Sequence, residues 1–367
     1  MQNGYQISNI EQIDSPALVV YPAKAAANIQ QTVDMAGDVN KLRPHVKTCK
    51  MREVCNMMLQ AGISKYKCAT IAEAEMLAML GSVDVLLAYQ PVGPKIIRLL
   101  NLAEAYPFTH FSCLIDCETS ATAIHEACRK KNITLDVFID LNVGMNRTGI
   151  IPGKAAELIS HIRRLPNLRI SGLHGYDGHI HDENPLERKK AADISFEKVR
   201  NLYLTMQPSF TYPLTMVMGG TPTFPVHINR PDCECSPGTF VFWDWGYKQM
   251  MKELPFEYAA LVVSRLISTV DEHHICVDLG YKSVAAESPL PRVHFLNAPE
   301  AVPSAQSEEH LVLKVPDSSK YAIGDVFYGV PRHICPTVAL YEKAFVIENN
   351  EMKKTWHVIA RNRIIKY

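Results

Sequence analysis

The first two thirds of the chain alternate short hydrophobic runs with longer segments of helical periodicity. Between Lys41 and about Trp245, runs such as KYKCAT, DVLLAYQ and HFSCLID are each followed by a helical pattern such as AEAEMLAMLG. Eight candidate strands follow one another in this order, from KLRPHV to DCECS. This alternation predicts a parallel sheet with crossover helices, and a closed (β/α)8 barrel accommodates eight such units. An open doubly wound sheet is the alternative, although no GxGxxG follows the first strand.

After Tyr258 the pattern changes to alternating hydrophobic and polar positions with few helical segments. Runs such as AALVVSRLISTV, HHICVDLG, HLVLKV and KAFVIEN predict an all-β second domain. The early stretch SPALVVYP predicts one more strand of that domain, followed by the helix AKAAANIQQTVDMAG. We therefore predict an α/β fold with a (β/α)8 barrel over residues 16–255 and a β domain over residues 256–367 together with 1–15.

Composition narrows the kind of partner. The 367 residues are 47% hydrophobic and 21% charged, as in a globular protein with a full core. Thirty-eight basic residues balance thirty-eight acidic ones, so no net field favours nucleic acid or an anionic membrane, and a small-molecule partner is expected. The stretch MQNGYQISNIEQ lacks the features of a signal peptide, and ten scattered cysteines fit reduced thiols. These features favour a cytoplasmic location.

Chemistry in a (β/α)8 barrel gathers where the strands end, and the first predicted strand ends in RPHVK. Arg43, His45 and Lys47 alternate there, so an extended chain would place them on one side. Burial beside other cations lowers the pKa of a lysine, which is what an amine needs to attack a carbonyl and form a Schiff base. The alternative is that these cations are solvated loop charges.

Two later strand ends carry further candidates. In DLNVGMNRTG, two glycines bracket Arg147, which could hold an anionic oxygen or could pair with Asp140. The stretch GLHGYDGHIHD concentrates polar groups at one strand exit, which indicates a site without deciding between a base, a ligand and a stacking platform. Its polar residues are His174, Tyr176, Asp177, His179, His181 and Asp182.

Phosphate and metal binding have separate candidates. In MGGTPTF, Gly219 and Gly220 followed by Thr221 and Thr223 offer free backbone N–H groups and hydroxyls, which suit a phosphate, although a glycine turn without a ligand is the alternative. In GVPRHICPT, His333 and Cys335 stand two residues apart, so an extended chain would direct an imidazole and a thiolate to one face. Two ligands are too few for a closed structural site and suit an open, catalytic one, and the alternative is a surface histidine beside a buried cysteine. Cys233 and Cys235 are interpreted as a strand pair because no further CxC or CxxC completes them.

Eight motifs in a fixed order carry a resemblance: RPHVKT, GMNRTG, GLHGYDGH, GGTPT, SPGTFVFWD, DLGYKSV, SEEH and HICPT. Together they resemble the fold-type III pyridoxal-phosphate enzymes of the D-threonine aldolase and eukaryotic-type D-serine dehydratase family. The resemblance spans residues 15–337. It implies an alanine-racemase-like barrel followed by a β domain, and a homodimer with its sites near the subunit interface.

The resemblance also implies roles for individual residues. Lys47 would bind pyridoxal 5'-phosphate covalently, with Arg43 and His45 as its setting. Arg147 would contact the phenolic oxygen of the cofactor, and Tyr176 would lie against its ring. Phosphate-binding residues would be Gly220 and Thr221. A divalent metal, zinc or manganese, would bind His333 and Cys335 and hold the β-hydroxyl of the substrate.

The implied activity is that of a lyase on D-β-hydroxy-α-amino acids, and two reactions stay open. Tyr176 favours an aldolase that cleaves D-threonine to glycine and acetaldehyde, with His179 or His181 as a hypothetical base for the β-hydroxyl. The HxC pair favours a dehydratase of D-serine or D-3-hydroxyaspartate, in which Lys47 would also remove the Cα proton. An amino-acid racemase and a non-catalytic pyridoxal-phosphate carrier are further alternatives.

Overall fold

The structure is a computed structural model that describes residues 4–367. The chain divides into two compact units, each assembled from several stretches. Unit 1 comprises residues 1–31, 48–54 and 239–361, and unit 2 comprises residues 32–47, 55–238 and 362–367. The predicted division into a barrel domain that ends at residue 255 and a β domain that begins at residue 256 stays a prediction. Within residues 4–367, no helix combines the length and the apolar character needed to cross a membrane.

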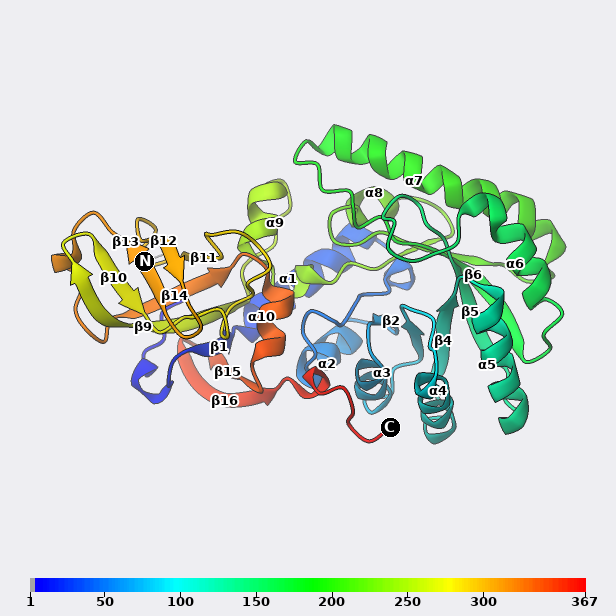
Figure 1. Cartoon of the computed structure of the whole chain (residues 1–367), viewed down its shortest axis with the longest axis horizontal. Helices are drawn as coiled ribbons and strands as arrows, with labels where there is room; N and C mark the ends of the chain where they lie inside the picture. The colour runs from blue at the N-terminus through cyan, green and yellow to red at the C-terminus, as the bar shows by residue number, and fades with distance from the viewer. Residues whose placement is uncertain (1–3) are drawn as a thin grey trace. The chain divides into compact units, whose positions relative to one another are not determined.

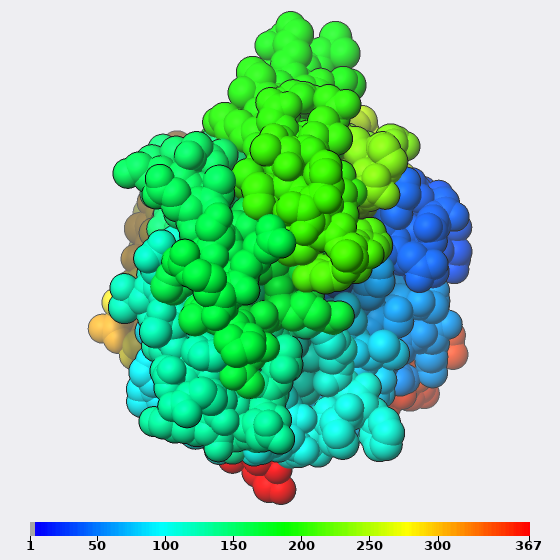
Figure 2. All heavy atoms as spheres, turned by 90° about the vertical axis from the view of Figure 1, so that its right-hand side faces the viewer, coloured from blue at the N-terminus to red at the C-terminus, as the bar shows by residue number. Residues whose placement is uncertain are grey.

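Unit 2 contains a seven-stranded parallel sheet whose strands neighbour one another in sequence order. The strands are β2 (Lys65–Cys68), β3 (Asp84–Leu87), β4 (His110–Ile115), β5 (Leu135–Asp140), β6 (Leu168–Gly175), β7 (Thr215–Met218) and β8 (Cys233–Cys235). The crossover helices are α3 (Ile71–Ala78), α4 (Pro94–Ala105), α5 (Glu118–Lys131), α6 (Ala155–Ile162), α7 (Pro185–Met206) and the short α8 (Phe224–His227). Figure 1 shows α3, α4 and α5 following the outside of the strands, and Figure 2 shows α7 as a green ridge on the outer face of unit 2.

The eighth place in the barrel is filled by the stretch KLRPHV without a regular strand. Leu42 bridges to Cys235 of β8, and His45 bridges to Lys67 of β2, both in parallel. The backbone N–H of Arg43 donates to the carbonyl of Cys235 at 2.8 Å. Pro44 lacks an N–H group, which limits regular pairing in this stretch. The predicted barrel is confirmed, with its first strand reduced to isolated bridges that connect β8 to β2.

Unit 1 is built on a nine-stranded, mostly antiparallel sheet. Its main path runs β12, β13, β10, β9, β1, β15 and β16, while β14 pairs with both β9 and β11. The strands are β1 (Ala17–Val20), β9 (Ala260–Asp271), β10 (His274–Val277), β11 (Val293–Phe295), β12 (Val302–Gln306), β13 (Leu311–Lys314), β14 (Val326–Pro331), β15 (Lys343–Glu348) and β16 (Glu351–His357). The predicted β-rich second part is confirmed.

The N-terminal segment belongs to this sheet, as the SPALVVYP pattern predicted. Strand β1 is buried at all four positions and pairs antiparallel with β9 and parallel with β15. Helix α1 (Pro22–Ala36) follows directly. Buried side chains such as Val262, Phe295 and Phe327 form one core of the unit. Unit 1 also carries two short helices, α9 (Trp245–Met250) and α10 (Ile334–Leu340), while α2 (Arg52–Gln60) begins in unit 1 and ends in unit 2.

Candidate active site

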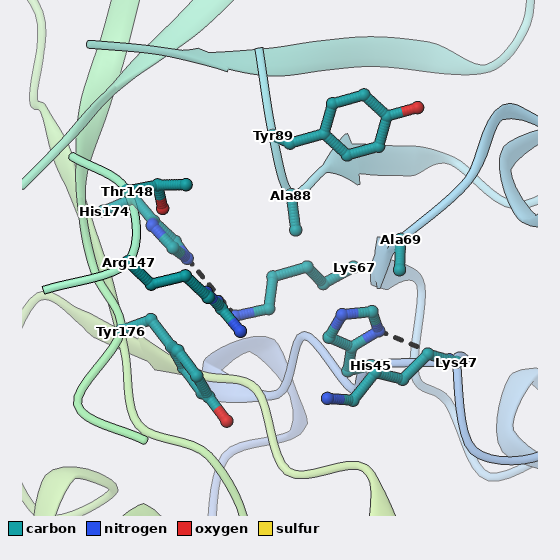
Figure 3. Close-up of a pocket in the computed structure, with 10 residues that line it drawn as sticks. All are labelled: His45, Lys47, Lys67, Ala69, Ala88, Tyr89, Arg147, Thr148, His174 and Tyr176. Atoms are coloured by element: carbon teal, nitrogen blue, oxygen red, sulfur yellow. Dashed lines mark hydrogen bonds between the residues drawn. The ribbon is translucent and has the colours of Figure 1, made fainter. Parts of the chain in front are cut away.

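A cavity of about 220 Å³ opens in unit 2 at the carboxyl ends of the parallel strands. It is formed by residues that follow or end β2, β3, β5 and β6, together with the stretch that closes the barrel. This is the face at which barrels assemble their active sites. The lining residues, drawn in Figure 3, are His45, Lys47, Lys67, Ala69, Ala88, Tyr89, Arg147, Thr148, His174 and Tyr176.

The predicted lysine lies in this cavity. Lys47 is adjacent to the imidazole of His45, whose Nδ1 accepts the backbone N–H of Lys47 at 3.3 Å. Arg43, predicted on the same side, does not line the cavity, because its guanidinium is buried in ion pairs with Asp84 and Glu234. Its expected role as the setting of Lys47 stays a prediction, and its ion pairs connect the stretch that closes the barrel to β3 and β8.

A second lysine, Lys67, occupies the centre of the cavity and is only 2% exposed. Its Nζ lies 3.3 Å from Nε2 of His174, and Nδ1 of His174 lies 2.7 Å from Oδ1 of Asp140. Burial would raise the pKa of Asp140, but the hydrogen bond from His174 holds that pKa below its ordinary range. The ionised carboxylate therefore accepts a hydrogen bond from Nδ1–H of His174. The lone pair on Nε2 is then available to accept an N–H of Lys67.

The charge state of Lys67 follows from its surroundings. Burial is the first cause that lowers its pKa, and the charge of Lys47 is the second; together they bring it to about 7. Burial and the charge of Lys67 likewise lower the pKa of His174. At neutral pH the cavity therefore holds a neutral imidazole and an amine that is protonated in only part of the molecules.

Arg147 and Tyr176 lie together at one side of the cavity. The Cζ of Arg147 is 5.1 Å and the Nζ of Lys67 is 5.3 Å from the ring centroid of Tyr176. Asp140 is engaged by His174, so its carboxylate is not the partner of Arg147 that the alternative interpretation expected. Two cations therefore meet one aromatic ring at the cavity, an arrangement that attracts an anionic ligand.

The predicted phosphate turn lies against the same ring. A Cβ atom on Gly220 would stand 3.1 Å from Cε2 of Tyr176, so the turn packs closely on this side chain. The buried Thr221 accepts the backbone N–H of Gly238 at its Oγ1, at 3.1 Å. The structure thus brings Gly220 beside a cavity residue and leaves the role of Gly220 and Thr221 in phosphate binding as a prediction.

The two predicted histidine bases, His179 and His181, do not line the cavity. The ring of His179 packs on the GMNRTG turn, where a Cβ on Gly144 would stand 2.6 Å from its Nε2. The Nδ1 of His179 is buried without a hydrogen-bond partner among the described residues. His181 directs its Nδ1 to the backbone carbonyl of His179 at 2.6 Å. Their catalytic role stays a prediction.

The candidate metal pair lies in unit 1 at the start of α10. The extended chain expected across HICPT is wrong: His333 is the N-cap residue, and Cys335 lies in the first turn of the helix. The carboxylate of Asp244 accepts the backbone N–H of Ile334 at 3.2 Å, which satisfies a donor at the helix start. Pro336 is compatible with a first turn, where its missing N–H is not needed.

Both candidate donors are held by neighbours. Oε1 of Glu287 lies 2.5 Å from Nδ1 of His333, which leaves Nε2 for a metal. Sγ of Cys335 lies 3.1 Å from the hydroxyl of Thr48 and 3.5 Å from that of Thr239. Burial would lower the pKa of His333, but Cys335, Asp244 and Glu287 raise it to about 9.

An imidazole, a thiol and an orienting carboxylate fit a borderline-soft divalent ion. Among residues 4–367, no group of three or more His, Cys, Asp or Glu side chains is arranged to hold a metal, and metal binding by His333 and Cys335 stays a prediction. Cys233 and Cys235 lie in β8, as the strand interpretation predicted, and burial raises the pKa of Cys235.

Sequence reasoning missed the central lysine. Lys67 stands between the buried Tyr66 and Cys68 in β2, and its only signal was its position in a strand of a predicted barrel, where alternate residues face the interior. His174 was noticed as one of several polar residues, and Asp140 only as a partner of Arg147. The register of β5 and β6 places Asp140 beside His174, and Lys67 reaches His174 from β2.

Comparisons with known proteins agree with this architecture. The profile of the family described as "Alanine racemase, N-terminal domain" matches residues 20–242, and that of "Putative serine dehydratase domain" matches residues 259–347. The D-threonine aldolase of an Arthrobacter species is 25% identical over 361 residues, which cover 96% of this chain and 94% of that protein. The crystal structure of D-threonine aldolase from Filomicrobium marinum has a TM-score of 0.89 at 26% identity and covers 96% of both chains.

A dehydratase is similar as well. The D-threo-3-hydroxyaspartate dehydratase of a Delftia species is 23% identical over 375 residues, which cover 94% of this chain and 97% of that protein. A D-threo-3-hydroxyaspartate dehydratase with one cysteine replaced by alanine, solved in a metal-free form, has a TM-score of 0.82 at 22% identity. It covers 94% of this chain and 97% of that chain. The similar proteins therefore include both lyase types.

Proposed function

Because the chain belongs to the family of alanine racemase N-terminal domains, we propose that it is a pyridoxal-phosphate- and metal-dependent lyase acting on D-β-hydroxy-α-amino acids. Its principal reaction in this proposal is the cleavage of D-threonine to glycine and acetaldehyde. The observation that carries the proposal is the cavity at the strand ends, which Lys47 lines and where Lys67 and Arg147 lie against the ring of Tyr176. A cofactor with an aromatic ring, a phosphate and a phenolic oxygen suits an aromatic surface among cations.

The chain offers a residue for each part of the cofactor. Lys47 would hold it covalently, Arg147 would bind its phenolic oxygen, and Tyr176 would lie against its ring. Gly220 and Thr221 would hold the phosphate beside that ring. When bound, pyridoxal phosphate supplies an electron sink for charge that develops at the Cα of an amino acid.

The metal would bind His333 and Cys335, and we propose zinc or manganese as the ion. A divalent ion at this pair would lower the pKa of the β-hydroxyl of the substrate. Glu287 would orient His333 and increase its basicity as a ligand. The base that removes the hydroxyl proton would be His179 or His181.

Dehydration is the second candidate, and the His-Cys pair favours it. Lys47 would then also remove the Cα proton of D-serine or D-3-hydroxyaspartate, and hydroxide would leave Cβ with assistance from the metal.

Product analysis separates the two reactions. The purified protein, supplied with pyridoxal phosphate and Mn²⁺ or Zn²⁺, is mixed with D-threonine, with a chelator-treated sample as control. Glycine and acetaldehyde identify the aldolase, whereas 2-oxobutyrate and ammonia identify the dehydratase. If neither pair forms in the metal-loaded sample with D-threonine, D-serine or D-3-hydroxyaspartate, the proposed function is wrong.

The assembly and location are part of the same proposal. We expect a cytoplasmic homodimer, as the resemblance to the fold-type III enzymes implies. Light scattering behind size-exclusion chromatography would give about twice the chain mass of 41.1 kDa. A monomer that retains full activity would contradict the dimer without affecting the chemistry.

A further inference from the structure

The cavity contains two lysines, and the proposed cofactor linkage uses only one of them. Lys67 is buried, with only 2% of its surface exposed. Its Nζ points into the cavity between His174 and Tyr176 (Figure 3). A buried lysine is costly unless it is paired or neutral. The hydrogen-bond partner of its Nζ, Nε2 of His174, offers a neutral lone pair and is not a carboxylate.

We propose that Lys67 is the acid–base group that takes the proton from the α-ammonium group of an amino acid entering the cavity. The proposal rests on the proposed function, because it assumes that Lys47 carries pyridoxal phosphate. The ammonium group transfers one proton to the neutral Nζ of Lys67, which becomes an ammonium group, and the amino acid gains the lone pair it needs to bond to the cofactor. The proton returns from Lys67 to the amine of the product as the product leaves.

The Asp140–His174 pair explains how Lys67 can hold that proton. The Nε2 atom of His174 accepts one N–H of Lys67 in either charge state, so the side chain keeps its orientation. The ionised Asp140 lies behind the imidazole at 2.7 Å and offsets the positive charge that Lys67 acquires. Lys67 is thus a base whose side chain keeps one orientation. His174, which holds it, does not need to change its own protonation state.

The pKa of Lys67, lowered to about 7, agrees with this role, because a base works best when its pKa lies near the working pH. Burial and the charges of Lys47 and Arg43 lower it, while Asp140 and Asp177 raise it. The titratable and charged groups around Lys67 are Arg43, His45, Lys47, Asp140, Arg147, His174, Tyr176 and Asp177.

The test follows cofactor exchange rather than turnover. Protein loaded with pyridoxal phosphate and freed of metal by a chelator is mixed rapidly with glycine, which has no β-hydroxyl, and cofactor absorbance reports the exchange of lysine for glycine. In Lys67→Met the cofactor should still attach to Lys47, but exchange at pH 7 should slow by about 100-fold. Imidazole in the buffer should restore part of the rate, because it replaces the missing base.

Lys65→Met is the matched control. Lys65 lies two residues earlier in β2 and pairs with Glu234 away from the cavity. The rate of cofactor exchange in Lys65→Met should therefore equal that of the unaltered protein. Exchange in Lys67→Met at the unaltered rate would overturn the proposal. Should that variant fail to fold, the pH profile of the unaltered protein decides: exchange should rise with pH through a midpoint near 7, since only neutral Lys67 accepts the proton, and a flat profile between pH 6 and 8 would overturn it.

Failure of the proposed function is a different result. In that case the unaltered protein would not attach pyridoxal phosphate to any lysine, and this inference would be wrong together with it. Normal loading and exchange in the unaltered protein, with no slowing in Lys67→Met, would remove the role of Lys67 alone.

Discussion

The barrel cavity and the His333–Cys335 pair differ in how the protein balances charge. In the cavity, Lys67 is 2% exposed, and its histidine partner is backed by the carboxylate of Asp140. At the metal pair, the side chain of His333 is 44% exposed and meets the similarly exposed Glu287. The cavity is therefore arranged by buried hydrogen bonds, whereas the histidine of the pair is held by a contact that is open to solvent.

The difference suggests what each region binds. Three cations, Lys47, Lys67 and Arg147, line the cavity, and Asp140 is the carboxylate that offsets them from behind His174. A surplus of positive charge around a cavity is stabilised by an anionic ligand such as a phosphate. The pair in unit 1 instead presents a nitrogen and a sulfur donor with a carboxylate behind them, which suits a cation. One region thus suits an anionic cofactor and the other a divalent metal.

The largest effect is expected from removal of the lysine that would carry the cofactor. Lys47→Ala should lower the rate of D-threonine breakdown by at least ~10³-fold, since a covalent attachment point and a nearby amine are lost together. The absorbance typical of lysine-bound pyridoxal phosphate should also disappear. A variant that keeps both rate and absorbance would show that another residue, with Lys67 first in line, holds the cofactor.

Cys335→Ala tests the other region by removing the sulfur donor. The variant should keep lysine-bound cofactor and lose at least ~100-fold in rate, because a Lewis acid contributes several kcal/mol to such a reaction. Metal content by elemental analysis should fall in parallel. Full metal content and full activity in Cys335→Ala would contradict the role of this pair.

A smaller effect is expected from the carboxylate behind His333. Glu287→Gln keeps the shape of the side chain but removes its charge, and metal affinity should fall by about 10–100-fold. Competition with a coloured chelator measures this affinity directly. The rate at saturating metal should recover, which distinguishes weaker binding from a lost catalytic step.

The smallest effect concerns the opposite end of the barrel, where ion pairs serve stability. Hydrogen bonds to Asp136 and Asp84 raise the pKa of His110 to about 9, against burial. The stability that His110 adds should therefore be full below pH ~6.5 and disappear as pH rises through about 9. His110 is 44% exposed, so solvent screening limits this to ~1 kcal/mol, or about 1–2 °C in the melting temperature relative to His110→Gln. If the melting temperatures of the unaltered protein and His110→Gln differed equally at pH 6 and pH 10, this role of His110 would be contradicted.

The sequence predicted the barrel well because each strand-and-helix unit repeats a local pattern. The short apolar strands β4 and β5 were readable from periodicity alone, as was the extra strand β1 in the sheet of unit 1. Long-range pairing was not readable in this way. The ion pairs of Arg43 with Asp84 and Glu234, which are distant in sequence, had no local signal.

The candidate site was predicted only in part, because local patterns identify strand ends but not long-range pairing. Lys47, Arg147 and Tyr176 follow strand ends and were found from their positions, and the structure brings all three to one cavity. Lys67 was missed because a lysine inside a strand resembles a solvent-facing position until the register is known. Spacing identified His333 and Cys335 as a pair, although α10 begins between them at Ile334, so His333 has an extended backbone and Cys335 a helical one.

The most direct test of the account is to identify the lysine that carries the cofactor. The protein is loaded with pyridoxal phosphate, with and without chelator, then reduced with borohydride, digested and analysed by peptide mass spectrometry. The account predicts a pyridoxyl group on Lys47 in both samples, because the cavity is arranged without the metal. A group on Lys67, or no modified lysine in the chelated sample, would contradict it.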